Sequence, residues 1–142
     1  MEEKESEVTK AVREAVVNAV EKGEDIKEKA GEITRDAVKK TLEGAEVTKE
    51  KVESVAKDAM KGTIEGAQKA KVETSEIVKG AVEGIIEGTK LAGAKAADLT
   101  EHAAEAALDA AKGAGDKAVD VVKGVVKGFL GGVKEVLEKK KE

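Results

Sequence analysis

The sequence predicts an all-α protein, and three observations carry this prediction. A pattern of apolar and charged residues recurs every 22 residues, no run alternates with a period of two, and proline is absent from the 142 residues. The clearest copies read ITRDAVKKTLEGA, VAKDAMKGTIEGA and IVKGAVEGIIEGT, and they align without a gap. The six copies that share this frame start at Ala11, Ile33, Val55, Ile77, Leu99 and Val121.

The spacing within each copy predicts the kind of helix. Apolar residues follow one another at steps of four, four and three, so each copy contains two blocks of eleven residues, called hendecads. Eleven residues in three turns give about 3.67 residues per turn, which favours a straight or right-handed coiled coil. The expected elements are a polar N-terminal tail (1–7), one hendecad helix (8–137) and a charged C-terminal tail (138–142).

We expect the helix to be continuous because a hairpin turn normally consumes residues and shifts the apolar phase, and no shift occurs. A helix from Val8 to Leu137 would be roughly 195 Å long at 1.5 Å per residue. The strongest candidate for a break is the Gly-Ala-Gly-Asp sequence at 113–116. An alternative is therefore a chain that folds back on itself at this point.

A single helix of this composition needs packing partners. Its fifteen glycines cost about 0.8–1 kcal/mol each relative to alanine. The apolar face covers roughly 130° of the circumference, which favours several helices around a shared core. We expect a homo-oligomeric bundle, with four chains preferred and three or five left open. The expected oligomer core consists of Ile33, Val38, Leu42, Val55, Met60, Ile64, Ile77, Val82, Ile86, Leu99, Val121, Val125 and Leu130.

Glycines and charges also follow the repeat. Gly44, Gly66, Gly88 and Gly132 share one position of the frame, where a missing side chain lets two helices approach closely. Acidic residues recur ten residues into the copies, and basic residues often lie two residues in. We expect these charges on a solvated face that points away from the core.

The composition excludes several classes of function. The chain has no Cys, Trp or Tyr and a single Phe, and its 26 basic and 30 acidic residues give a net charge of −4. The absence of cysteine excludes a disulfide scaffold, a thiol enzyme and a cysteine zinc site. The net negative charge excludes a strongly basic nucleic-acid binder. His102 is the sole histidine, and the serines have no histidine placed for a triad. We expect no catalytic site, no metal and no cofactor.

Membrane contact is expected at most at a surface. No apolar run approaches the ~18–20 residues of a membrane-spanning helix. The polar start MEEKESEVTK is unlike a signal or transit peptide, so we expect a cytoplasmic protein. Segment 118–137 is the most apolar, and its valines, Phe129 and lysines suit a helix lying on a lipid surface.

The repeats resemble three kinds of protein. The segment 16–43 resembles uncharacterised bacterial proteins built from hendecad coiled coils. The tandem elevens, including IKEKAGEIT from Ile26 and the stretch 95–120, are similar to group 3 late embryogenesis abundant proteins, which imply a stress protectant that is disordered until dried. The sequence KTLEGA from Lys40 is faintly similar to the lipid-binding repeats of synucleins and perilipins. The preferred expectation is a self-assembling spacer or scaffold, with the protectant and the lipid-surface helix as alternatives.

Overall fold

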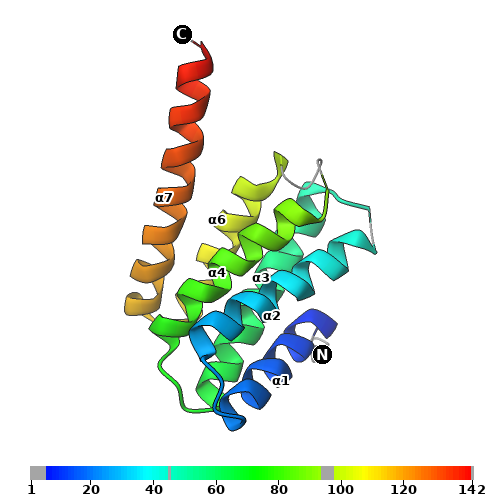
Figure 1. The fold of residues 1–142 in the computed structure, drawn as a ribbon, viewed down its shortest axis with the longest axis vertical. Helices are drawn as coiled ribbons and strands as arrows, with labels where there is room; N and C mark the ends of the chain where they lie inside the picture. Colours follow the sequence, from blue (N-terminus) through cyan, green and yellow to red (C-terminus); the bar gives the residue numbers. More distant parts are fainter. Residues whose placement is uncertain (1–5, 45, 94–97, 142) are drawn as a thin grey trace.

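A computed structural model describes residues 6–44, 46–93 and 98–141, and this part of the chain is all-helical with no strand (Figure 1). The all-α prediction is therefore confirmed. The elements are α1 (Glu7–Glu21), α2 (Ile26–Glu43), α3 (Lys49–Lys69), α4 (Thr74–Leu91), α6 (Thr100–Ala111), the short 3₁₀ helix η1 (Lys112–Ala114) and α7 (Asp116–Lys141).

The expected continuous helix is not what the structure contains. The described residues form six shorter α-helices, and consecutive helices run in opposite directions (Figure 1). The reason is that each helix and its turn together take up about one 22-residue copy. Turns that recur once per copy leave the apolar phase unchanged from copy to copy. An uninterrupted apolar phase is therefore compatible with regularly spaced turns.

Polar side chains define where the first three helices begin. Ser6 accepts a hydrogen bond from the Thr9 amide at 3.0 Å, and Asp25 accepts one from the Lys27 amide at 3.2 Å. Thr48 accepts one from the Lys51 amide at 3.1 Å. Each of these side chains satisfies an amide that has no partner inside its helix, so the chain can start a new helix here at little cost.

The ends of α1 and α3 share one backbone motif. At the end of α1 the Glu24 amide donates to the Ala19 carbonyl at 3.1 Å, and Gly23 adopts a φ of 74°. At the end of α3 the Val72 amide donates to the Ala67 carbonyl at 2.9 Å, and Lys71 adopts a φ of 61°. Both are Schellman turns, in which a left-handed residue closes the helix. At Lys71 a non-glycine residue occupies the position that glycine favours.

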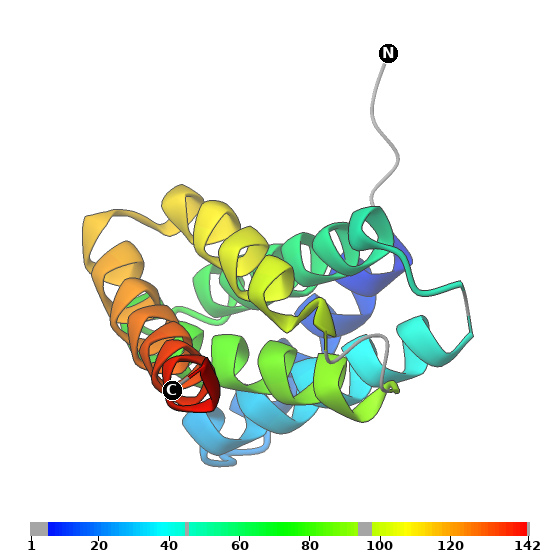
Figure 2. The same ribbon diagram turned by 90° about the horizontal axis from the view of Figure 1, so that it is seen from above.

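The helices form two layers. In one layer α3 contacts both α1 and α6, and in the other α4 contacts both α2 and α7 (Figure 2). Each helix therefore packs beside the second-next helix along the chain as well as against its neighbours in the opposite layer. This is the arrangement of a helical-repeat stack, in which each unit is covered by the adjacent ones.

The core lies between the layers and consists of Ala, Val, Ile, Leu and Met side chains, without a fully buried aromatic ring among the described residues. Leu42, Met60, Ile77 and Ile85 are its largest fully buried residues. Of the residues expected in an oligomer core, the structure buries Val38, Leu42, Val55, Met60, Ile64, Ile77, Val82 and Ile86 inside the chain. Ile33, Leu99, Val121 and Val125 are partly buried against this core, and the side chain of Leu130 lies outside the described residues.

Candidate functional site

Titratable side chains meet in an open surface pocket of about 210 Å³, which is lined by Glu53, Lys57, His102, Glu105 and Asp109. No group of three or more metal-binding residues is present among the described residues. His102 lies at the surface, with its Nδ1 atom 3.7 Å from Glu53 Oε1. Ser6 caps α1 and Ser75 donates to the Glu73 carboxylate at 3.0 Å, so both hydroxyls have structural partners. The features that remain to be explained are helix-packing surfaces.

The first packing surface joins α1 to α3 through glycines. A Cβ atom on Gly62 would lie 2.5 Å from the Thr9 carbonyl oxygen, and one on Gly66 would lie 2.8 Å from Val16 Cβ. No side chain larger than hydrogen fits at either position without moving the helices apart. The Thr9 hydroxyl donates across this contact to the Asp58 carbonyl at 3.0 Å.

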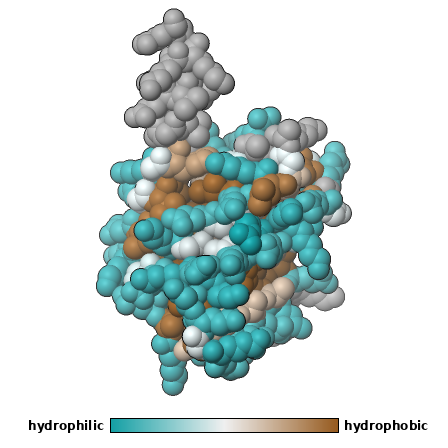
Figure 3. Space-filling view, in the orientation of Figure 1, coloured by the Kyte–Doolittle hydropathy of each residue, from teal (hydrophilic) through white to brown (hydrophobic). Residues whose placement is uncertain are grey.

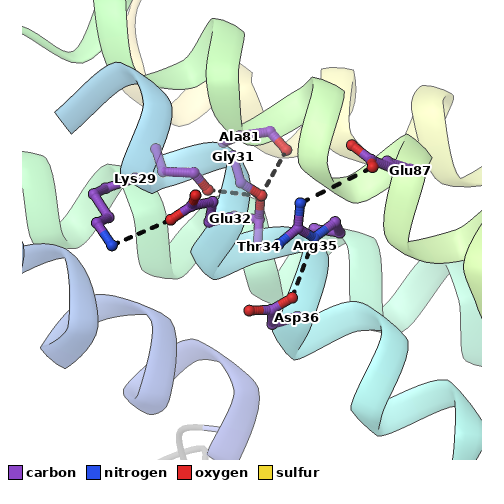
Figure 4. A network of polar contacts seen from close by, with 9 residues as sticks. Lys29, Gly31, Glu32, Thr34, Arg35, Asp36, Ala81 and Glu87 are labelled. Atoms are coloured by element: carbon purple, nitrogen blue, oxygen red, sulfur yellow. Dashed lines mark hydrogen bonds and ion pairs between the residues drawn. The ribbon is translucent and has the colours of Figure 1, made fainter. Parts of the chain in front are cut away.

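The second packing surface, between α2 and α4, repeats the first one copy later (Figure 4). Gly84 and Gly88 are the 22-residue equivalents of Gly62 and Gly66. A Cβ on Gly84 would overlap the Gly31 carbonyl and the Thr34 hydroxyl. The buried Thr34 hydroxyl is shared between its own helix, through the Ala30 carbonyl at 2.8 Å, and the Ala81 carbonyl of α4 at 3.1 Å.

Ion pairs follow the same register across both layers. Arg13 lies 3.5 Å from Glu65, Arg35 lies 4.0 Å from Glu87, and Lys57 lies 3.3 Å from Asp109. The two partners are 52 positions apart in each pair (65 − 13, 87 − 35 and 109 − 57). The three contacts join α1 to α3, α2 to α4 and α3 to α6, so the same register recurs along the stack.

These charges had been expected on a solvated face, and the structure adds a role to that expectation. Basic residues two positions into a copy and acidic residues ten positions into a copy connect a helix to the second-next one. At 1.5 Å per residue, the eight positions between them place the two charges of one helix about 12 Å apart. The two charges therefore cannot pair with each other within one helix, and this spacing was the available sequence signal for contacts between helices.

Two surface carboxylates have shifted pKa values because of neighbouring lysines. Lys117 of α7, at 3.1 Å, and the Ser75 hydroxyl lower the pKa of Glu73. Lys57 and Lys112, each at 3.3 Å, lower the pKa of Asp109. Both carboxylates are exposed, so these pairs are screened by salt and contribute modestly to stability.

The glycines predicted to allow close approach do not share one environment. Gly66 and Gly88 lie in the tight contacts described above. Gly44 ends α2 at the surface, where a Cβ would lie 3.6 Å from its nearest neighbour, because the chain turns at this point of the copy. The side-chain environment of Gly132 lies outside the described residues. At Gly66 and Gly88 the close approach of two helices takes place inside one chain.

An open apolar groove lies between α4 and α7. It has a volume of about 370 Å³ and is lined by Glu83, Ile86, Glu87, Lys90, Val125 and Phe129. The Lys90 ammonium lies 4.8 Å from the centre of the Phe129 ring and so links the two helices. Figure 3 shows apolar surface between α7 and the body of the protein, bordered by hydrophilic residues. We refer to this feature below as the α4–α7 groove.

Segment 118–137 is part of α7 and is directed partly into the protein. Ala118, Val122 and Val126 are buried, whereas Val121, Val125 and Phe129 are partly covered. No helix in the described part of the chain is both long and apolar enough to cross a membrane.

Comparison of the chain with family models, curated proteins and solved structures finds no match.

Sequence reasoning missed the buried threonines and Gly62. Thr9, Thr34, Thr63 and Thr89 are fully or almost fully buried, and each donates a hydrogen bond to a backbone carbonyl. Thr63 and Thr89 bond to the carbonyl four residues earlier in their own helices. A hydroxyl that donates to a carbonyl of its own helix has its hydrogen bond satisfied and can be buried without another polar partner. These threonines therefore pack as core residues. Their recurrence near apolar positions was the signal available in the sequence.

Proposed function

We propose that this protein is a non-enzymatic, self-assembling scaffold or spacer built from a stack of helical repeats. The observation that carries the proposal is the recurring register between second-next helices. Tight glycine contacts recur in the α1–α3 and α2–α4 pairs, and the 52-residue ion-pair spacing recurs in these two pairs and in α3–α6, so these helices stack in a common register. A stack of units in one register is stiff along its length, which is what a spacer needs.

Two further features support a folded structural role over catalysis or protection on drying. The aliphatic core would favour folding in water, whereas a chain that folds only on drying lacks enough apolar residues to form one. The hydroxyls of Ser6 and Ser75 are hydrogen-bonded to a helix-terminal amide and to the Glu73 carboxylate, which supports a structural use of both serines.

Self-assembly completes the proposal, with a second copy of the chain as partner. The wide apolar face that favoured four helices around a core is used largely within one chain, so assembly needs a smaller surface than a tetrameric coiled coil. The test is a thermal melt followed by circular dichroism at two concentrations about fifty-fold apart, together with sedimentation velocity. A midpoint that rises with concentration and a mass above one chain are expected. A helical chain of single mass at both concentrations would contradict self-assembly, and low helicity in buffer would contradict the folded scaffold.

A further inference from the structure

The surface on which assembly depends can be located if the proposed function holds. We propose that two copies of the chain pair through α7, side by side and parallel, so that the lysines on α7 of each copy face the acidic rim of the other copy's α4–α7 groove. The proposal rests on the self-assembly proposed above. It is carried by the groove, by the charges at its rim and by the order of side chains around α7.

The groove has an apolar floor and a charged rim. Ile86, Val125 and Phe129 provide the floor. On α4 the exposed carboxylates of Glu83 and Glu87 stand beside it, together with Lys90 over the Phe129 ring, so the rim carries two negative charges and one positive. Glu87 contacts Arg35 only at 4.0 Å, the limit for an ion pair. An occupant that combines a slim apolar edge with positive charge therefore fits this groove best.

The exposed side of α7 has these properties. Lys123 and Lys127 are four residues apart and both exposed, so they form one basic edge. Gly124 and Gly128 are also exposed and have no atom within 4 Å of the place where a Cβ would stand. At 100° per residue, the order around the helix is Val125 at the groove, then Gly128 and Gly124, then the lysine edge.

The order of these side chains selects the orientation of the pair. In a two-fold pair of parallel helices, each flank of one helix faces the opposite flank of the other. The lysine edge of each copy then lies beside the groove and its Glu83 and Glu87. In an antiparallel pair each flank faces its own equivalent, which would set lysine edge against lysine edge at an electrostatic cost.

The glycines between the two flanks allow the helices to approach. They stand 44 residues, or two copies, after Gly80 and Gly84, which pack against the backbone of α2 within the chain. The close contact between α2 and α4 is thus a precedent, inside this molecule, for a helix packed on glycines at these positions of the copy. The glycines permit the contact, and the apolar floor and the charges give it affinity and direction.

The test is a charge reversal followed by sedimentation velocity. Glu83→Lys with Glu87→Lys, or Lys123→Glu with Lys127→Glu, should weaken self-association by at least about tenfold. The four substitutions together restore opposite charges across the pair and should recover most of the wild-type association. All four side chains are exposed, and Glu87→Lys removes only the 4.0 Å pair with Arg35, so circular dichroism should show that each variant keeps its helical content. Glu14→Lys with Glu21→Lys on α1 is the matched control and should leave association unchanged.

The outcomes separate this inference from the proposed function. If the wild-type chain self-associates and neither reversal weakens it, or if the combined variant fails to recover, the surface is wrong while self-assembly stands. If the wild-type chain keeps the mass of one copy at every concentration, both fail. Sedimentation of a single-copy chain with anionic vesicles, lost in the Lys123→Glu, Lys127→Glu variant, would assign the surface to lipid and overturn the pairing.

Discussion

The glycine contact between α2 and α4 can be tested by adding a single carbon atom. In Gly88→Ala the new Cβ would stand 2.5 Å from the Arg35 carbonyl oxygen and 3.1 Å from Val38 Cβ. The first of these neighbours is backbone, so it cannot rotate away as a side chain would. The two helices must therefore separate locally, or α2 must bend.

The expected loss of stability is the difference between two effects. Overpacking of this kind costs about 1–3 kcal/mol. Alanine returns about 0.8–1 kcal/mol because it is a better helix former than glycine. Since the clash is with backbone, the cost should fall in the upper part of its range. The net destabilisation of Gly88→Ala should then be about 1–2 kcal/mol.

Gly44→Ala provides the matched control, because Gly44 occupies the same position of the 22-residue copy. Its φ is −85°, which alanine tolerates, and a Cβ there would lie 3.6 Å from the nearest atom. The free energy of unfolding should change by less than about 0.5 kcal/mol. If close approach followed only from position in the repeat, both variants would lose stability equally.

The assay is urea unfolding followed by circular dichroism at 222 nm. With a slope of about 2 kcal/mol per M, the midpoint for Gly88→Ala should fall by about 0.5–1 M. The midpoint for Gly44→Ala should stay close to that of the wild-type protein. A Gly88→Ala variant as stable as Gly44→Ala would refute the close contact between α2 and α4.

Three further predictions concern a turn, a buried hydroxyl and a surface ion pair. Lys71→Gly should stabilise the protein by about 0.5–1 kcal/mol in the same urea assay, because glycine adopts the native φ of 61° without strain. The control is Lys61→Gly at an exposed position inside α3, which should lower the stability by about 1 kcal/mol. Thr34→Val should cost about 1 kcal/mol or more in chemical unfolding, because it leaves a buried α4 carbonyl without its cross-helix donor. Because Lys117 lowers the pKa of Glu73 in the folded state, their contact contributes above the unfolded pKa of about 4.3 and is lost as the pH falls through the folded pKa. Thermal melts from pH 7 to pH 3 at low salt should therefore show a smaller loss of midpoint in Lys117→Met than in the wild-type protein, and an equal loss would count against the pair.

The helical class was predictable from the sequence because the apolar period is a local property. Most of the residues chosen for an oligomer core are indeed apolar positions that face a core, as Leu42 and Ile77 show by their full burial. Periodicity states which side of a helix is covered. It does not state whether the covering helix belongs to the same chain.

The turns were harder to predict because no single residue type marks all of them. Gly23 and Gly115 both have positive φ angles, and Gly115 lies in the Gly-Ala-Gly-Asp sequence named as the strongest candidate for a break. The turn at Lys71 has no glycine, and that between α2 and α3 is marked mainly by Thr48 as a cap. The caps were short polar residues followed by a helical pattern, which is a usable but weak signal.

The groove between α4 and α7 could not be predicted from the repeat. Position within the copy would place Gly124 and Gly128 in a tight contact like that of Gly80 and Gly84, yet they are exposed. The reason is that α7 buries Ala118, Val122 and Val126 against the body of the protein and turns its glycines outward. Only the three-dimensional packing of the last helix shows that this side is left open.

The stack of short helices can be tested most directly by one distance within the chain. The sequence contains no cysteine, so Lys57→Cys with Asp109→Cys gives two unique sites for spin labels, both at exposed positions. The distance between the labels is measured by double electron–electron resonance. An excess of unlabelled chain dilutes the labelled molecules, so that only the distance inside one molecule is recorded. The stack places the two native side chains in an ion pair at 3.3 Å, so the labels should lie within about 20 Å. In one continuous helix the 52 residue steps from 57 to 109 would span about 78 Å, and a distance of that size would contradict the fold.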